Sequence, residues 1–219
     1  MLFRSTEIRI VDPQSREPLP VGERGLVLAR GPQVMAGYFH KPEATAKVLD
    51  GEGWFDTGDL GQLLPDGSLL LTGRAKDTIV LSSGENIEPG PLEECLVACT
   101  LVEQVMLVGQ DRKALGALVV PKAETLAAFA REQGLQQPAH WPDGSPGGGE
   151  AALLKAFTSR LNRRLQARPG ARPDERLAGV ALVQPFSIEN GLLTQTLKQR
   201  RDRIAARDAA AIASLYGEG

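Results

Sequence analysis

The hydrophobic pattern of this chain changes at the segment GRAKD, residues 73–77. Before it, short apolar or alternating runs are separated by turns, and Asp66-Gly67 between LGQLL and SLLLTG is a strong hairpin signal. After it, apolar runs of strand length alternate with longer stretches of helical periodicity. The change predicts an α+β protein: a small antiparallel β-rich sheet or barrel over 1–75, then a small α+β domain over 76–219.

Periodicity and turn residues indicate the individual elements. Strands are expected at 6–12, 24–30, 53–64, 68–74, 102–110, 115–121 and 179–186. Helices are expected at 42–49, 124–133, 152–168 and 196–216, and 79–100 reads as strand, loop and helix. The Pro- and Gly-rich stretch at about 134–150 has little to bury and predicts a flexible insertion.

Composition limits the class of protein. With 219 residues, 42% of them hydrophobic, the chain can build a core. A net charge of −2 gives no general basis for binding nucleic acid, although the basic stretch 198–207 could do so locally. The apolar runs fall short of the ~18 residues that span a membrane, and MLFRSTEIRIVD lacks the apolar core of a signal peptide. We therefore expect a soluble, cytoplasmic protein that does not bind nucleic acid.

The two cysteines, Cys95 and Cys99, are four residues apart in a segment with helical periodicity. No histidine lies near enough in the sequence to complete a zinc site with them. We interpret both as small apolar residues in or near the core, and expect no metal ligands in this chain.

Three residues near the change in pattern are candidates for binding. Asp59, after Thr57-Gly58, could accept hydrogen bonds from a pair of ribose hydroxyls, although a lone TGD is more often a hairpin turn. Arg74 could return to the same sheet edge, where the alternative is a structural ion pair with Asp59. Gly84 in SSGENIEP leaves room for a close approach, or forms an ordinary turn.

Lys198, in ENGLLTQTLKQRRDR, is ambiguous by itself. A lysine beside Gln199, Arg200 and Arg201 is most often a cation on a solvated helix face. Its alternative role is to stabilise negative charge that develops during a reaction.

Taken in order, three segments carry a family resemblance. GWFDTGDLG, LTGRAKDTIVLSSGENIEPGPLEE and NGLLTQTLK resemble the closing motifs of the adenylate-forming (AMP-binding) superfamily, and GPQVMAGYFHKPEATA fits the segment before them. GLLTQTLKQRR is most similar to long-chain fatty acyl ligases. SGENIEP with VMLVGQDRKALGALVVP resembles bacterial, cyanobacterial-like, long-chain acyl-CoA or acyl-acyl-carrier-protein synthetases. The resemblance covers nearly the whole chain except the insertion.

The resemblance implies a two-step reaction. A fatty carboxylate attacks the α-phosphate of ATP to give an acyl-adenylate and pyrophosphate, and a thiol of CoA or of a carrier protein then displaces AMP. It also implies Mg²⁺, whose ligands would lie mostly upstream. The expected partners are a fatty acid and CoA or acyl carrier protein, and peripheral association with membranes is left open.

The motifs assign roles by position. Asp59 matches the aspartate that holds the ribose hydroxyls, and Arg74 the arginine beside it. Lys76 matches the hinge about which a mobile C-terminal domain, 76–219, turns between the two steps. Gly84 matches the loop along the thiol's entry path, and Lys198 the lysine that reaches the α-phosphate and carboxylate.

Two departures from the family pattern affect these expectations. Gln195 stands where long-chain ligases usually carry proline, which frees the loop before Lys198. The chain also lacks the family's upstream phosphate loop and adenine-binding segment, so 1–75 resembles only the closing subdomain of the large domain. We expect the chain alone to be inactive in adenylation. The alternatives are a subunit of a split ligase, or a non-enzymatic module that binds carrier protein.

Overall fold

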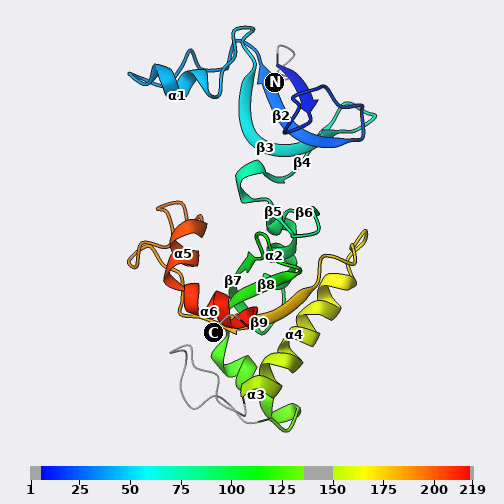
Figure 1. Ribbon diagram of the computed structural model, residues 1–219, viewed down its shortest axis with the longest axis vertical. Coiled ribbons are helices and arrows are strands. Elements are labelled where there is room, and N and C mark those ends of the chain that lie inside the picture. The colour runs from blue at the N-terminus through cyan, green and yellow to red at the C-terminus, as the bar shows by residue number, and fades with distance from the viewer. Residues whose placement is uncertain (1–5, 136–149, 218–219) are drawn as a thin grey trace. The chain divides into compact units, whose positions relative to one another are not determined.

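The computed structural model describes residues 6–135 and 150–217 (Figure 1). It divides into two compact units, unit 1 (Met1–Thr78) and unit 2 (Ile79–Gly219). Unit 1 is built around antiparallel strands, and unit 2 combines a sheet with helices. The predicted α+β fold class is therefore confirmed. The predicted flexible insertion at about 134–150 lies almost entirely outside the described residues.

Unit 1 contains one four-stranded antiparallel sheet, in the order β1-β2-β3-β4. Its strands are β1 (Glu7–Val11), β2 (Arg24–Arg30), β3 (Phe55–Leu63) and β4 (Leu69–Arg74). Each lies where turn-bounded apolar runs predicted it, and Asp66 and Gly67 form the turn between β3 and β4, where Ser68 donates its N–H to Asp66 Oδ1 at 2.9 Å. A few buried apolar side chains, including Val11, Leu26 and Leu60, hold the sheet together.

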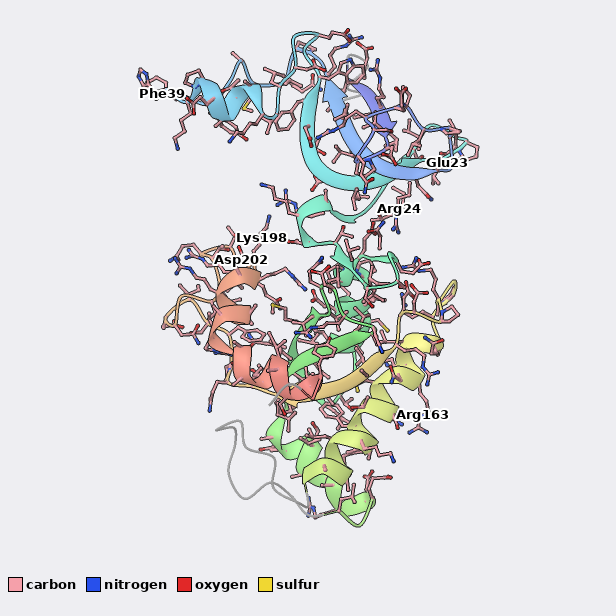
Figure 2. The ribbon with its side chains drawn as sticks, viewed as in Figure 1. Glu23, Arg24, Phe39, Arg163, Lys198 and Asp202 are labelled. Carbon is pink, nitrogen blue, oxygen red and sulfur yellow. The ribbon has the colours of Figure 1, made fainter. Side chains whose placement is uncertain are left out.

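A short helix, α1 (Pro42–Ala46), interrupts the strands of unit 1. Pro42 occupies its first turn, where a missing backbone N–H is tolerated. The helix ends three residues before the predicted end, because Leu49 pairs with Phe55 as an isolated β-bridge. Just before it, the side chain of Phe39 is 86% exposed (Figure 2).

The main sheet of unit 2 lies between two layers of helices (Figure 1). Its strand order is β7-β8-β9, with β7 and β8 antiparallel and β8 and β9 parallel. The strands are β7 (Val102–Val108), β8 (Leu115–Pro121) and β9 (Leu177–Leu182), and a small hairpin of β5 (Ile79–Val80) and β6 (Asn86–Ile87) precedes them. The helices are α2 (Pro89–Val97), α3 (Ala123–Glu132), α4 (Glu150–Gln166), α5 (Arg201–Arg207) and α6 (Ala209–Leu215).

The central strand β8 explains why this part of the sequence is continuously apolar. Ala117 and Val119 face the core formed with α2, α3 and α4. Leu118 and Val120 face the opposite core, which includes side chains of α5 and α6. A strand covered on both faces needs apolar residues at every position, and all of β8 is buried.

Cys99 is buried and Cys95 partly buried against the core beside α2, as predicted. Among residues 6–135 and 150–217, no helix combines the length and the apolar character needed to cross a bilayer.

The prediction of one helix over 196–216 is wrong. The chain stays irregular as far as Arg200, and two short helices, α5 and α6, meet at Asp208. Leu197 has φ of 60°, a left-handed conformation that a helix cannot contain. Lys198 therefore lies in a loop before a helix, and is not a cation on a helix face.

Candidate functional site

Asp59 and Arg74 lie opposite each other on the neighbouring strands β3 and β4. Arg74 Nε donates to Asp59 Oδ1 at 2.9 Å. This hydrogen bond raises the pKa of Arg74 above its ordinary value. The Asp59 side chain is 31% exposed, and no protein donor to its Oδ2 occurs among the described contacts. The ion pair exists, and it leaves one carboxylate oxygen available to a ligand.

The backbone before Asp59 has the conformation that the TGD motif suggested. Gly58 has φ of 70°, which favours glycine, and its N–H donates to Asp56 Oδ1 at 2.9 Å. Thr57 Oγ1 donates to the carbonyl oxygen of Val27 at 2.8 Å, which ties this bend to β2. The turn contact is made by Asp56, so the carboxylate of Asp59 is not used to form the turn.

Lys76 lies in a single 3₁₀ turn, η1 (Ala75–Asp77), at the end of unit 1. Its side chain is exposed. Thr78 Oγ1 donates to the carbonyl oxygen of Arg74 at 3.3 Å across this turn.

Gly84 lies in the tight turn between β5 and β6. Its N–H donates to the carbonyl oxygen of Leu81 at 2.8 Å, and its φ is 86°. A Cβ at this position would meet no atom within 4 Å, so the glycine is required by its backbone conformation and not by crowding. The turn is exposed and open to a ligand.

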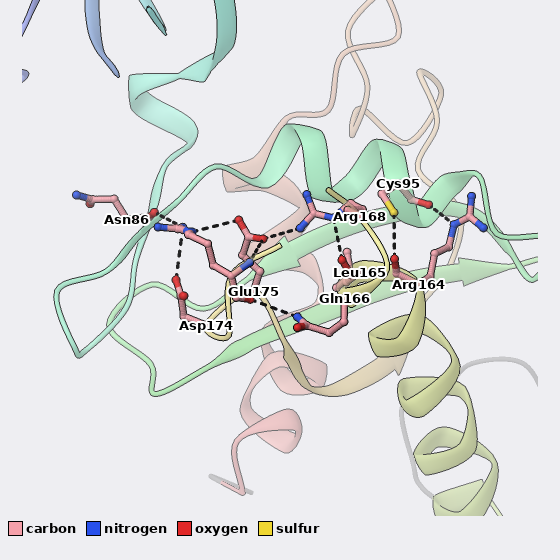
Figure 3. Close-up of polar contacts among 9 residues, drawn as sticks. Asn86, Cys95, Arg164, Leu165, Gln166, Arg168, Asp174 and Glu175 are labelled. Carbon is pink, nitrogen blue, oxygen red and sulfur yellow. Dashed lines mark hydrogen bonds and ion pairs between the residues drawn. The ribbon is translucent and has the colours of Figure 1, made fainter. Parts of the chain in front are cut away.

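The end of the Gly84 turn is held by a cluster of charged residues that precedes β9 (Figure 3). Arg172 Nη2 donates to the carbonyl oxygen of Asn86 at 2.8 Å, and Arg172 Nε to Glu175 Oε1 at 3.3 Å. Arg168 Nη2 donates to Glu175 Oε2 at 2.6 Å. Burial raises the pKa of Glu175, but the hydrogen bonds from Arg172 and Arg168 outweigh it and keep that pKa below its ordinary value.

Lys198 is exposed near the end of a narrow loop that leads into α5 (Figure 2). Its backbone N–H donates to Thr194 Oγ1 at 3.0 Å, and its carbonyl oxygen accepts the N–H of Thr194 at 2.9 Å. Leu193 and Gln199 form a β-bridge at the base of the loop. No ion pair of Lys198 occurs within the described part of the chain, so its ammonium group is free to meet an anion.

Comparison with known proteins decides the family. Residues 76–143 match the model of the AMP-binding enzyme C-terminal domain. Proteins named as long-chain fatty acid ligases match nearly the whole chain. Nearly the whole chain is therefore homologous to AMP-binding enzymes.

Three relatives illustrate the relationship. Probable acyl-activating enzyme 16, chloroplastic, of Arabidopsis thaliana is 38% identical over 98% of this chain and 30% of its own length. Long-chain-fatty-acid--[acyl-carrier-protein] ligase AEE15, chloroplastic, of the same plant is 37% identical over 98% of this chain and 28% of its own length. Human long-chain-fatty-acid--CoA ligase 1 is 34% identical over 95% of this chain and 29% of its own length. The chain thus spans less than a third of these AMP-binding enzymes.

Solved structures of this family share the fold. The A domain of carboxylic acid reductase from Segniliparus rugosus, in complex with AMP and a co-purified carboxylic acid, matches with a TM-score of 0.77 and 26% identity. The match covers 98% of this chain and 32% of that chain. The corresponding adenylation domain from Mycobacterium chelonae matches with a TM-score of 0.74 and 25% identity, over 97% of this chain and 31% of that chain.

Sequence reasoning missed the side chains that hold the candidate loops at Gly84 and Lys198 in place. Arg172 anchors the end of the Gly84 turn, and Glu93 with Arg201 anchors the chain just after Lys198. Glu93 and Arg201 are 108 residues apart, and a single sequence carries no signal that would pair them. The basic run after Lys198 was the one available hint.

Proposed function

We propose that this chain is part of an ATP-dependent fatty acid ligase. The reaction joins a fatty carboxylate to AMP with release of pyrophosphate, and then transfers the acyl group to a thiol of CoA or of acyl carrier protein. The observation that carries the proposal is the similarity of 98% of the chain to a ligase named for this activity, at 37% identity.

Asp59 and Arg74 are proposed to hold the nucleotide. Because Arg74 Nε donates a hydrogen bond to Asp59 Oδ1, the carboxylate has a fixed orientation. Oδ2 can then accept hydrogen bonds from ribose hydroxyls, and hydrogen bonds to an ionised acceptor are stronger than neutral ones. The AMP present in the structure of a relative supports a nucleotide as the ligand.

Lys198 is proposed to act in the first step. Negative charge accumulates on the α-phosphate as the carboxylate attacks, and a lysine side chain carries a positive charge at neutral pH. Electrostatic stabilisation of this charge requires no proton transfer. Its exposure at a loop without an ion-pair partner in the described structure supports this role.

Lys76 and Gly84 are proposed to serve the change between the two steps. Lys76 lies in the single 3₁₀ turn that precedes the boundary of the two units, which suits a hinge residue. Gly84 leaves its turn free of a side chain, which suits a loop along which a thin thiol-bearing arm must pass. Neither role involves chemistry at these residues.

Mg²⁺ is the metal that this family's nucleotide chemistry implies. Within residues 6–135 and 150–217, no group of three His, Cys, Asp or Glu residues is placed to hold a metal ion. We therefore assign no metal ligand to this part of the chain and derive no step through the ion.

The proposal is tested by completing the chain. A chimera joins the preceding region of AEE15 to Met1 of this chain, and palmitate-dependent pyrophosphate release from ATP is measured. We expect release from the chimera, and none from the 219-residue polypeptide alone. Palmitate-dependent release by the polypeptide alone would contradict the second expectation. A monodisperse chimera that binds ATP but turns over no fatty acid would contradict the ligase assignment.

A further inference from the structure

We propose that Arg201 and Glu93 are positioning residues that hold Lys198 in place for acyl-adenylate formation. The inference rests on the proposed function, because it assigns to these residues the orientation of the lysine used in that reaction. Neither residue would touch the substrate.

β7 is an edge strand. In the sheet order β7-β8-β9, β7 has a strand neighbour on one side only among the described residues. The backbone groups of Val105 and Leu107 on the other side must find partners elsewhere, because an unpaired backbone group is costly when buried. They are bound by side chains from α2 and from the segment that follows Lys198.

Three hydrogen bonds join Glu93, Arg201 and the backbone of Leu107 in a ring. Glu93 Oε1 accepts both the N–H of Leu107 at 2.7 Å and Arg201 Nη1 at 2.8 Å. Arg201 Nη2 donates to the carbonyl oxygen of Leu107 at 2.6 Å. The side chains of Arg201 and Glu93 are only 20% and 15% exposed, so solvent screens this ion pair little.

A second contact continues along the same edge. Gln199 Nε2 donates to the carbonyl oxygen of Val105 at 2.9 Å. Gln199 directly follows Lys198, and Arg201 lies three residues after it. The segment immediately C-terminal to the lysine is therefore attached to β7 through the backbone groups of two successive residues that face the edge away from β8.

The N-terminal side of the loop is fixed as well. Leu192 is buried in the core beside α5, and its carbonyl oxygen accepts the N–H of Arg200 at 2.8 Å. The exposed tip, Gln195 to Lys198, is thus short and closed at its base. Gln195 stands where a proline is expected, so no proline ring fixes the φ angle there. The attachments at the two ends of the loop must therefore restrict its conformation.

The alternative is that this ion pair stabilises unit 2 and has no connection with Lys198. A double-mutant cycle separates the two explanations, because residues that act through one another have non-additive effects. In the chimera described above, the rate of pyrophosphate release is measured for Arg201→Ala, Lys198→Ala and the double variant.

We expect Arg201→Ala to lower kcat for adenylation by about tenfold to a hundredfold, since a misplacement of ~1 Å can cost that much. KM for ATP should change little. In the Lys198→Ala background the same change should have almost no further effect. Transfer from supplied palmitoyl-adenylate to CoA should be unaffected. The matched control is Arg203→Ala, which removes an exposed charge from the same helix.

A second measurement uses the 219-residue chain and does not depend on activity. Hydrogen exchange of the Lys198 backbone amide should be faster in Arg201→Ala than in the native chain, and close to native in Arg203→Ala. If Arg201→Ala does not fold, Arg201→Lys, which keeps the charge but loses the forked contact, replaces it in both experiments.

The outcomes are distinct. Equal losses for Arg201→Ala in both backgrounds, or unchanged exchange at Lys198, would overturn the positioning role. Loss of activity in Arg201→Ala with no loss in Lys198→Ala would refute the function proposed for Lys198 and remove the basis of the inference.

Discussion

Asp59 and Arg74 face each other across β3 and β4, and Arg74 Nε lies 2.9 Å from Asp59 Oδ1. The pair is partly exposed, so its contribution to stability is small, as for most surface ion pairs. The Asp59–Arg74 contact is therefore better explained as a means of orienting the Asp59 carboxylate than as a source of folding stability. The first prediction tests this explanation.

Asp59→Ala in the chimera should raise KM for ATP about tenfold to a hundredfold. Loss of a hydrogen bond to a charged group costs about 1.5–3 kcal/mol, which corresponds to that range. The matched control is Glu7→Ala, which removes the carboxylate of the Glu7–Arg30 ion pair on the same sheet. Equal changes in KM for the two variants would contradict nucleotide binding at Asp59.

Gly84→Ala should destabilise unit 2 by about 1 kcal/mol, because its φ of 86° is unfavourable for any residue with a Cβ. Urea unfolding of the 219-residue chain measures the change. Gly90→Ala is the control: Gly90 lies in α2 with space around it and without a left-handed φ, so alanine there should be neutral or stabilising. Equal destabilisation by both changes would contradict the claim that the left-handed φ of Gly84 requires glycine.

Tyr216 should make stability depend on pH in the alkaline range. Burial raises its pKa to about 12, and its hydroxyl lies 3.1 Å from the carbonyl oxygen of Ala114. Because the folded state favours the protonated phenol, the contribution of Tyr216 is complete below pH ~10 and is lost as the pH rises toward 12.

The measurement compares the unfolding free energies of the native chain and Tyr216→Phe at several pH values. The native chain should be more stable by about 1 kcal/mol at pH 8, because phenylalanine cannot make the hydrogen bond of the Tyr216 hydroxyl. The difference should shrink above pH ~10. Tyr38→Phe, at an exposed tyrosine, serves as the control. A difference that stays constant from pH 8 to 11.5 would contradict a raised pKa.

Leu71→Lys should reduce self-association of the 219-residue chain. Leu71 is 57% exposed on β4, an edge strand that also exposes Leu69 and Leu70. Exposed apolar edge strands favour association between chains, and a lysine on the edge opposes it. Sedimentation velocity measures the effect. Val97→Lys, at an exposed apolar residue of α2, should change association less.

Much of the fold could be predicted from local sequence. The short, turn-bounded apolar runs of β1 and β2, the Asp66-Gly67 turn and the wholly apolar β8 are each visible within a single stretch of sequence, because the burial of a strand depends on its own residues. The predicted helix over 196–216 failed because helical propensity is a weak local preference. The hydrogen bonds of Thr194 and the left-handed Leu197 override it.

The candidate site was predictable only in part. Asp59, Arg74, Gly84 and Lys198 were identified by motif, and the structure gives each a distinct setting. The contacts that fix the loops around them were not predictable. Arg201 reaches Glu93 and the backbone of Leu107, which are far from it in sequence, and only the packing of α5 beside β7 and α2 brings them together.

The most direct test of the account is the rate of acyl-adenylate formation in the chimera with Lys198→Ala. Loss of a group that stabilises transition-state charge should lower palmitate-dependent pyrophosphate release by about a hundredfold or more. Lys122→Ala, at another exposed lysine of unit 2, should leave the rate near that of the parent. An unchanged rate of adenylation in Lys198→Ala would contradict the account.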